Sequence, residues 1–390
     1  MARAADPDPH AAPKRFARPG ILESAPAWPD DTADWKKQKL GPLPDPKGAN
    51  TMNRADIIGA PGVAAIESLG ELRFHALGDS GATNVDHAEL VAEEMATDYK
   101  DGAGALNPAF FFHLGDIVYG PDKLAHYVDR FYAPYRHYPG KIIAIPGNHD
   151  GETVSPADSP SLKGYLANFC ANDASVPPGA SSSGIFRETM TQPGAYWLLE
   201  APFVRIVGLY SNRIENPGFL EAKTASGAPD THQIDWLRQT LATIAGSPDK
   251  KALIIATHHP PFSEGGHTGS KHMLDTIDQC CTAAGVLPDA FLSGHSHNYQ
   301  RYTRRINGRQ IPYVVAGTGG KAPQKVPPAT GQPSTVSNAQ TTYDVAAQDY
   351  GYPFVTASKA KLTIEFWQLG DEHTKPLDTV TLDLASHVVS

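Results

Sequence analysis

Gly115-Asp116-Ile117-Val118-Tyr119 follows an apolar run at residues 109–114 that has the composition of a buried strand. A strand that ends in Gly-Asp places a carboxylate at the carboxyl end of a sheet, where open α/β folds bind their ligands. Tyr119 comes three residues later, so it can face the same site from a tight loop. One carboxylate can bridge two metal ions, and an ionised phenol beside it is a hard oxygen ligand suited to a ferric ion. The stretch therefore predicts a metal centre at the end of a buried strand.

Four more predicted strands end in residue types that bind metals. They lie at 72–77, 141–146, 252–256 and 289–292, and the residues that follow them are Asp79, Asn148, His258, and the pair His295 and His297. Residues two apart in an extended segment point the same way, so the rings of this pair can reach two neighbouring ions. Each cluster alone is also compatible with a polar turn after a strand. Five such strand ends together favour a two-metal phosphoesterase, whose ions lie roughly 3.5–4 Å apart.

The rest of the pattern alternates strands with helices and then changes to strands alone. Helices are predicted at 85–99, 123–132, 161–170, 232–245 and 271–284, and a hairpin at 194–210. Later strands are predicted at 299–306, 312–316, 352–354, 361–369 and 379–384. The Gly/Pro/Ser-rich stretch 317–350 between them is predicted to be a long functional loop. This order favours an α/β fold in which helices cover the outer faces of a β-sandwich.

Composition and charge narrow the class of protein. The 390-residue chain is 41% hydrophobic, enough for a large core, and its formal charge of −9 argues against a nucleic-acid partner. No apolar run approaches the roughly 20 residues of a membrane span. Residues 1–66 are rich in Pro, Ala and Asp and are predicted to form a partly irregular arm before a catalytic domain at 67–390. Three cysteines and a start without a secretory signal favour a cytoplasmic protein, with a secreted or periplasmic one as the alternative.

Five motifs occur in the order found in the purple acid phosphatases, which belong to the calcineurin-like metallophosphoesterases. They are Asp79-x-Gly81, Gly115-Asp116-x-x-Tyr119, Gly147-Asn148-His149-Asp150, Ile255-x-x-His258 and Gly294-His295-x-His297. The chain resembles this family over about 72–320, although Ile255 stands where the family has valine. Gly81 in place of the superfamily's usual histidine, together with Tyr119, is typical of the purple branch. The resemblance implies an α/β/β/α sandwich of two mixed sheets flanked by helices.

The resemblance also implies which residues hold which ion. Asp79, Tyr119 and His297 would bind a ferric ion, Asn148, His258 and His295 would bind a divalent ion (iron, zinc or manganese), and Asp116 would bridge the two. The two ions outweigh the charges of two carboxylates and one tyrosinate, so the centre keeps the positive charge that an anionic phosphate needs. Ligand type alone does not select iron over manganese, because geometry and metal supply also decide.

The implied reaction is hydrolysis of a small phosphate monoester by a metal-bound hydroxide that attacks phosphorus in line. His149 would assist the leaving group, with Asp150 orienting it. His267, on the Gly-rich loop after His258, would contact the substrate. A phosphodiesterase of nucleotides or lipid head groups on the same site is the alternative, and a non-catalytic metal-binding scaffold is a more remote one.

One motif also suggests a different chemistry, that of a serine protease. Gly78-Asp79-Ser80-Gly81 matches the nucleophile motif of chymotrypsin-like proteases. A helix is predicted directly after it, where an all-β barrel needs strands, so the protease interpretation fails on context. The sequence does not predict the natural substrate, the divalent metal or the oligomeric state.

Overall fold

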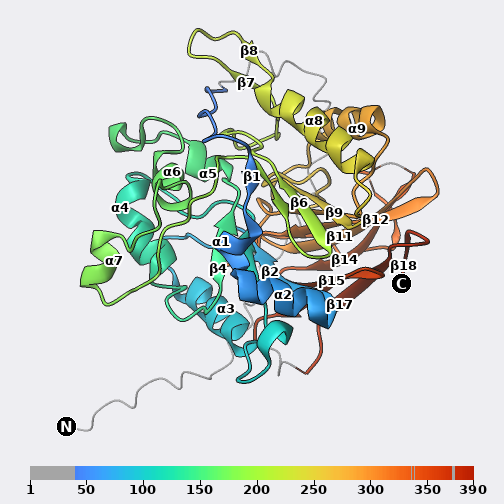
Figure 1. The fold of residues 1–390 in the computed structure, drawn as a ribbon. Helices are drawn as coiled ribbons and strands as arrows, with labels where there is room; N and C mark the ends of the chain where they lie inside the picture. Colours follow the sequence, from blue (N-terminus) through green and yellow to red (C-terminus); the bar gives the residue numbers. More distant parts are fainter. Residues whose placement is uncertain (1–39, 335, 338, 371–373) are drawn as a thin grey trace.

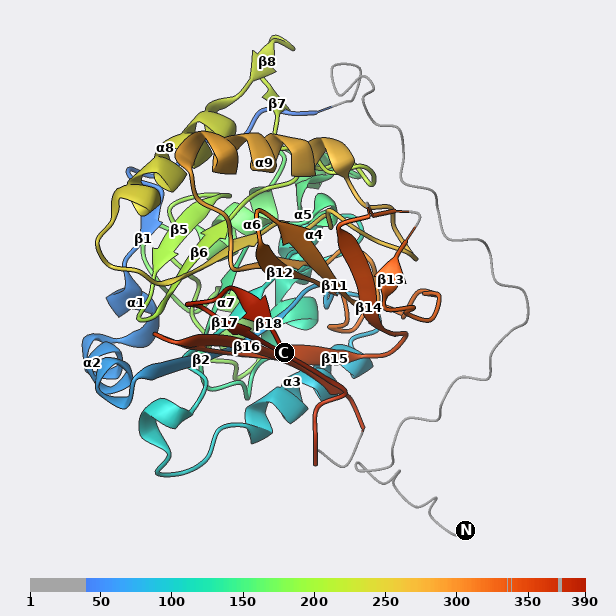
Figure 2. The same ribbon diagram turned by 90° about the vertical axis from the view of Figure 1, so that its right-hand side faces the viewer.

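The computed structural model describes residues 40–334, 336–337, 339–370 and 374–390. Two large mixed sheets pack face to face, and helices cover the outer face of each. Figure 2 shows the layers from top to bottom: helices α8 (His232–Gly246) and α9 (Lys271–Ala284), the two sheets, and helices α2 (Ala60–Leu69) and α3 (Asp86–Thr97). The predicted sandwich of two mixed sheets flanked by helices is confirmed.

One sheet has seven strands within the described residues, in the order β18-β17-β16-β15-β2-β3-β4. Its strands are β2 (Glu71–Leu77), β3 (Phe110–His113), β4 (Lys141–Ala144), β15 (Gly351–Ser358), β16 (Lys361–Gln368), β17 (Asp378–Asp383) and β18 (Val388–Val389). Strands β2, β3 and β4 run parallel, whereas β15 joins β2 antiparallel. The carboxyl ends of β2, β3 and β4 therefore lie on the same side of the sheet.

The other sheet has nine strands in the part of the chain that the structure describes, in the order β1-β5-β6-β9-β10-β12-β11-β14-β13. These are β1 (Thr51–Met52), β5 (Trp197–Glu200), β6 (Val204–Gly208), β9 (Ala252–Ala256), β10 (Ala290–Ser293), β11 (Tyr299–Ile306), β12 (Arg309–Ala316), β13 (Gln332–Pro333) and β14 (Thr341–Ala347). Its centre, β6-β9-β10-β12, is parallel. Each sheet thus brings a set of parallel strand ends to its carboxyl edge.

The remaining elements surround these layers (Figure 1). They are α1 (Arg54–Ile58), α4 (Lys123–Tyr127) with a π-helical turn at Val128–Tyr132, α5 (Asn148–Gly151), α6 (Lys163–Phe169), α7 (Pro178–Ser182), two short 3-10 helices (Gly104–Leu106 and Pro156–Asp158), and a small hairpin of β7 (Ala222–Lys223) and β8 (Pro229–Asp230). Among the described residues, no helix has the length and apolar character to cross a membrane.

The central strands are apolar on both faces because both faces are covered. Ile254 of β9 packs in the core shared by the two sheets, together with Trp197 and Phe112. Its neighbours Leu253 and Ile255 point the other way, into the core beneath α8 and α9. This double burial explains why these strands appear in the sequence as continuous apolar runs.

The structure adds detail to the predicted arm and corrects one predicted loop. The predicted arm lies outside the described residues as far as residue 39, but residues 51–69 form β1, α1 and α2, and β1 pairs in parallel with β5. Pro61 is in the first turn of α2, where its missing N–H costs nothing, so proline was a poor sign of irregularity here. The predicted loop 317–350 was wrong at its end, because β14 pairs with β11 there and Tyr343 stacks on Tyr302 at 5.1 Å.

Candidate metal centre

The predicted ligands lie where the parallel strands end. Six of them lie two to four residues after the end of β2, β3, β4, β9 or β10, and Tyr119 lies further along the loop after β3. Asp79, Asp116 and His295 have left-handed backbone, with φ of 64, 55 and 69°. Residues other than glycine rarely adopt this conformation, and its occurrence is concentrated at functional sites. The turns after three of the strands are therefore bent to aim a ligand-type side chain at one place.

Asp79, Tyr119 and His297 form one cluster. The Tyr119 hydroxyl donates to Asp79 Oδ1 at 2.9 Å and lies 3.3 Å from His297 Nε2. His297 Nε2 is in turn 3.5 Å from Asp79 Oδ1. The other carboxylate oxygen of Asp79 accepts the backbone N–H of His295 at 2.8 Å, which fixes the orientation of the group. The structure thus brings together the three residues predicted for the ferric ion.

Asn148, His258 and His295 form a second cluster, and Asp116 lies beside it. His258 Nδ1 donates to the carbonyl of Leu114 at 2.9 Å, so Nε2 faces Asn148 Oδ1 at 3.2 Å and Asp116 Oδ2 at 3.4 Å. The ring centroids of His258 and His295 are 5.0 Å apart. Asp116, His258 and His295 each offer a ligand atom within 4.8 Å of the others. These are the residues predicted for the divalent ion and the bridge.

The buried charges in the two clusters and the shifted pKa values of their side chains fit a cation-binding site. Asp116 Oδ2 is buried without a hydrogen-bond partner among the described residues. Burial raises the pKa of Asp116, but His258 and His149 outweigh it and hold that pKa below its usual value. Burial lowers the pKa of His258, yet Asp116 and Asp79 raise it to about 9. Burial and the same two carboxylates hold the pKa of Tyr119 well above its usual value. Metal ions would supply the positive charge that lets His258 and Tyr119 release their protons and become ligands.

Two glycines allow the loops to approach each other closely. A Cβ atom at Gly81 would lie 1.8 Å from the carbonyl oxygen of Ile117, and one at Gly147 would lie 2.1 Å from Asp116 Oδ1. Neither distance is possible between non-bonded atoms, so any side chain at these positions would push the Asp116 turn away. This close approach gives a physical reason for glycine at the third position of Asp79-x-Gly81.

The family model of the calcineurin-like phosphoesterases matches residues 72–299, more than half of the chain. The chain belongs to the calcineurin-like phosphoesterase family. This family typically binds two metal ions, and membership indicates metal-dependent hydrolysis of phosphate esters. A search of curated proteins gives no match.

Three solved structures are similar to this chain at low sequence identity. GAP50, the anchor in the inner membrane complex of Plasmodium, is similar with a TM-score of 0.54 and 13% identity, over 80% of this chain and 89% of that chain. PhoD matches with a TM-score of 0.47 and 12% identity, over 89% and 73%. A dimetal phosphatase from Danio rerio matches with a TM-score of 0.46 and 11% identity, over 80% and 98%. At such identity the likeness to GAP50 bears on the fold alone.

His149 lies beside the two clusters of this phosphoesterase site. Its backbone N–H donates to Asp116 Oδ1 at 2.9 Å, and its ring centroid is 4.4 Å from that of Tyr119. Its Nδ1 lies 2.7 Å from Glu152 Oε1, so Glu152 is the carboxylate that orients the ring. Burial lowers the pKa of His149, but Asp116 and Glu152 raise it to about 9. Glu152 follows His149 by three residues, at the C-cap of α5, and no helix was predicted here that would have indicated the pairing.

Asp150, which was predicted to orient His149, makes other contacts. Its carboxylate accepts the backbone N–H groups of Gly147 at 2.8 Å, Ile117 at 3.1 Å and Val118 at 3.3 Å. The side chain is buried, with 4% of its surface exposed. These contacts fasten the turn after Asp116 to the first turn of α5. They suit a positioning role, and a catalytic role for Asp150 stays a prediction.

His267 lies at the same site, as predicted. Its ring stacks on that of His295 with centroids 4.2 Å apart, and its Nδ1 is 3.3 Å from Glu215 Oε1. Gln324 contacts the other ring nitrogen of His267 at 3.2 Å. His267 therefore lies directly over a predicted ligand, although a contact with substrate remains a prediction.

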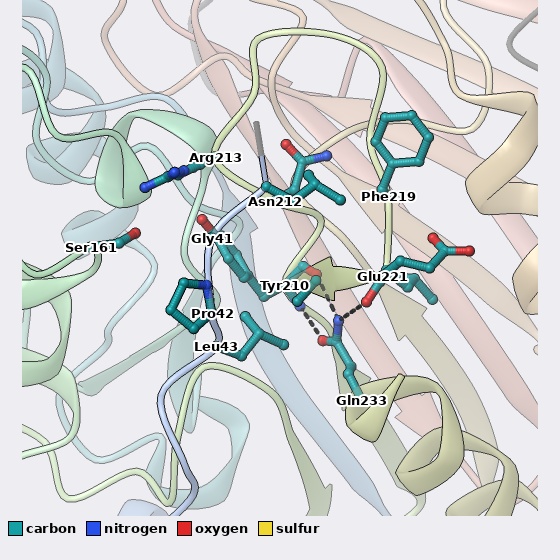
Figure 3. A pocket seen from close by; sticks show the side chains of 13 residues that line it. Gly41, Pro42, Leu43, Ser161, Tyr210, Asn212, Arg213, Phe219, Glu221 and Gln233 are labelled. Atoms are coloured by element: carbon teal, nitrogen blue, oxygen red, sulfur yellow. Dashed lines mark hydrogen bonds between the residues drawn. The ribbon is translucent and has the colours of Figure 1, made fainter. Parts of the chain in front are cut away.

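Sequence reasoning missed the loop after β6. Glu215 Oε2 accepts from the amide of Asn148 at 3.2 Å, and Asn216 Oδ1 is 3.1 Å from His295 Nε2. Gln233 of α8 holds both ends of this loop by bonding the backbone N–H and carbonyl of Tyr210 and the carbonyl of Leu220. Figure 3 shows these bonds beside a small cavity, of about 10 Å³, which Gly41 and Pro42 of the first described segment line together with Arg213.

Ser80, the serine of the protease-like motif, is buried in the core. Ser80 Oγ lies 2.8 Å from His113 Nε2, and neither residue has exposed surface. His113 Nδ1 accepts the N–H of Gly115, so Nε2 carries the proton that it donates to Ser80. Burial lowers the pKa of His113 to about 3, which keeps the ring neutral. This pair links the two strand ends that carry Asp79 and Asp116, and no substrate can reach it.

Proposed function

We propose that this phosphoesterase is a purple acid phosphatase-type hydrolase of phosphate monoesters, with one ferric and one divalent ion. The position of Tyr119 carries the proposal. Its hydroxyl oxygen lies within 3.3 Å of both Asp79 Oδ1 and His297 Nε2, so a phenol is one member of a cluster of ligand-type side chains. A phenolate is a hard oxygen donor that suits a ferric ion.

The other assignments follow the two clusters. Asp79, Tyr119 and His297 would hold the ferric ion, Asn148, His258 and His295 would hold the divalent ion, and Asp116 would serve both. The assignment of His258 is supported by its hydrogen bond to the carbonyl of Leu114, which directs Nε2 toward Asn148 and Asp116. Such a partner on the far nitrogen is what metal-binding histidines usually have.

When bound, the two ions supply a hydroxide nucleophile and positive charge for the transition state. The chain itself positions the groups that meet the substrate. His149 protonates the departing oxygen, and Glu152 fixes the direction of its ring through the 2.7 Å contact. His267, stacked over His295, contacts the phosphate or its leaving group. Asp150 holds the Asp116 turn in place.

Metal analysis combined with turnover of two esters tests the proposal. Protein purified without chelator should contain two metal ions per chain, at least one of them iron, and should hydrolyse 4-nitrophenyl phosphate faster than bis(4-nitrophenyl) phosphate. Asp116→Ala should lose metal and turnover together, because the shared carboxylate is gone. Asp101→Ala, which removes an exposed carboxylate, should match the parent.

The metal content and the turnover of the two esters distinguish the proposed phosphatase from a phosphodiesterase and from a non-catalytic scaffold. Ester hydrolysis by protein with one metal or none contradicts the two-metal mechanism. Faster turnover of the diester identifies a phosphodiesterase. Two bound metals with no turnover of either ester identify a scaffold.

A further inference from the structure

The turn at 317–321 lies against the strand end that carries Asp79. The N–H of Gly78 donates to the carbonyl of Ala316 at 2.9 Å, and the N–H of Gly319 donates back to the carbonyl of Gly78 at 3.0 Å. The N–H of Lys321 donates to the carbonyl of Asp79 at 2.8 Å. Because the turn is bonded to a ligand-bearing strand end, the backbone of Lys321 is held at a fixed place beside the metal centre.

The side chain of Lys321 reaches over the ring of Tyr119. Its Nζ lies 4.4 Å from the centroid of the Tyr119 ring, which is a cation–π distance. The residue is half-buried. None of the ion pairs among the described residues involves Lys321, so its positive charge is not neutralised by a carboxylate in the part of the chain that the structure describes.

Two glutamates at the site contact histidines. Glu152 lies 2.7 Å from His149, and Glu215 lies 3.3 Å from His267. Lys321 is thus a cation next to Tyr119 that forms no ion pair with any carboxylate of the described residues. Such a charge in a partly buried place attracts a ligand anion more strongly than it would in bulk water.

We propose that Lys321 is a specificity-determining residue that binds the second negative charge of a phosphate monoester. The proposal rests on the function proposed above and answers which class of ester that site prefers. A phosphate monoester carries nearly two negative charges at neutral pH, because its second pKa is about 6. A phosphate diester carries one. An ammonium on a flexible stem is a point charge that can follow the terminal oxygens without a fixed bidentate geometry.

A matched pair of substrates tests this at pH 7. 4-Nitrophenyl phosphate and methyl 4-nitrophenyl phosphate share a leaving group and differ by one negative charge. Lys321→Met keeps the apolar stem over Tyr119 and removes the charge. It should lower kcat/KM for the monoester by about 10- to 100-fold, as expected for the loss of one charged contact. For the diester the change should stay below about 3-fold, and Lys321→Arg should recover most of the monoester rate.

The binding of inorganic phosphate provides a second test that does not depend on turnover. Inorganic phosphate should bind metal-loaded Lys321→Met more weakly than the parent by a similar factor in isothermal titration calorimetry, with both metals still present. Lys359→Met removes an exposed lysine at the end of β15 remote from the turn and should change neither quantity. It controls for the loss of one positive charge from the whole protein.

Three results would overturn the proposal. Equal losses on the two substrates would mean that Lys321 only supports Tyr119. No loss on the monoester and unchanged phosphate binding would mean that the ammonium does not contact the ligand. Loss of metal would assign Lys321 to the integrity of the centre. If the parent protein hydrolysed no ester at all, the proposed function would fail, but the calorimetric comparison would still decide whether Lys321 binds the anion.

Discussion

Replacing Asp150 by alanine tests how the metal centre is held together. The carboxylate is buried and accepts three backbone N–H groups, from Gly147, Ile117 and Val118. Leaving one buried donor without a partner costs about 1–3 kcal/mol, so three would cost roughly 3–9 kcal/mol if none were satisfied again. A water molecule entering the vacated space could bond to some of these donors, which places the expected loss near the lower end, at about 3–5 kcal/mol.

That loss is a large part of the roughly 5–15 kcal/mol by which domains are stable. Asp150→Asn keeps one acceptor oxygen but turns a donor toward an N–H, so it should lose about half as much. Urea unfolding of the metal-free proteins gives the free energies of unfolding, and elemental analysis gives the metal content. Asp150→Ala should also bind metal more weakly, because the Asp116 turn and α5 are no longer fastened to each other.

One combination of results would refute the positioning role of Asp150. If Asp150→Ala unfolded at the same urea concentration as the parent, kept both metals and lost turnover, then the carboxylate would act in the reaction and the positioning role would be wrong. Asp101→Ala serves again as the exposed-carboxylate control and should leave stability and turnover unchanged.

Three further predictions concern single side chains. Tyr119→Phe should abolish the visible charge-transfer band of a ferric tyrosinate while the fold, followed by circular dichroism, stays intact; a variant with the parent's spectrum would exclude Tyr119 as a ligand. His149→Ala should keep both metals and slow turnover by about 10²–10⁴-fold, most strongly for alkyl phosphates, whose departing oxygen needs a proton. An equal loss on nitrophenyl and alkyl phosphates would argue against proton donation. Ser80→Ala should retain most of the activity and cost about 1–3 kcal/mol of stability, because the buried N–H of His113 loses its acceptor; an activity loss as deep as that of Asp116→Ala would reopen the nucleophile question.

The strand ends were predictable because the information is local. An apolar run followed by Gly-Asp or Gly-His specifies both a buried strand and the polar residue at its end, and the seven predicted ligands do meet in the structure. The family match then covers the same stretch, 72–299. Asp150 shows the limit of the same reasoning, because its place beside His149 in the sequence said nothing of the three backbone groups that it binds.

The parts that escaped prediction depend on contacts between distant segments. Glu215 and Asn216 reach the site only because α8 fixes their loop through Gln233, and nothing near residue 215 indicates that it lies beside Asn148. Lys321 lies in the stretch 317–350, which was predicted to be a functional loop without any single residue being indicated. Strand β14 was not predicted, since its small and polar residues are ordered by pairing with β11 and by the stacking of Tyr343 on Tyr302.

The contact at Gly81 has a consequence for protein engineering. With the position of a Cβ only 1.8 Å from the Ile117 carbonyl, the first two loops of the site cannot be exchanged separately with those of a relative that carries histidine at the third position of its first motif. A graft of the first loop alone would displace the carboxylate of Asp116, and a graft of the second alone would leave a void where the glycine now packs. The two loops form a single transplantable module, and libraries that aim to convert one branch of the superfamily into another should vary residues 79–82 and 115–119 jointly.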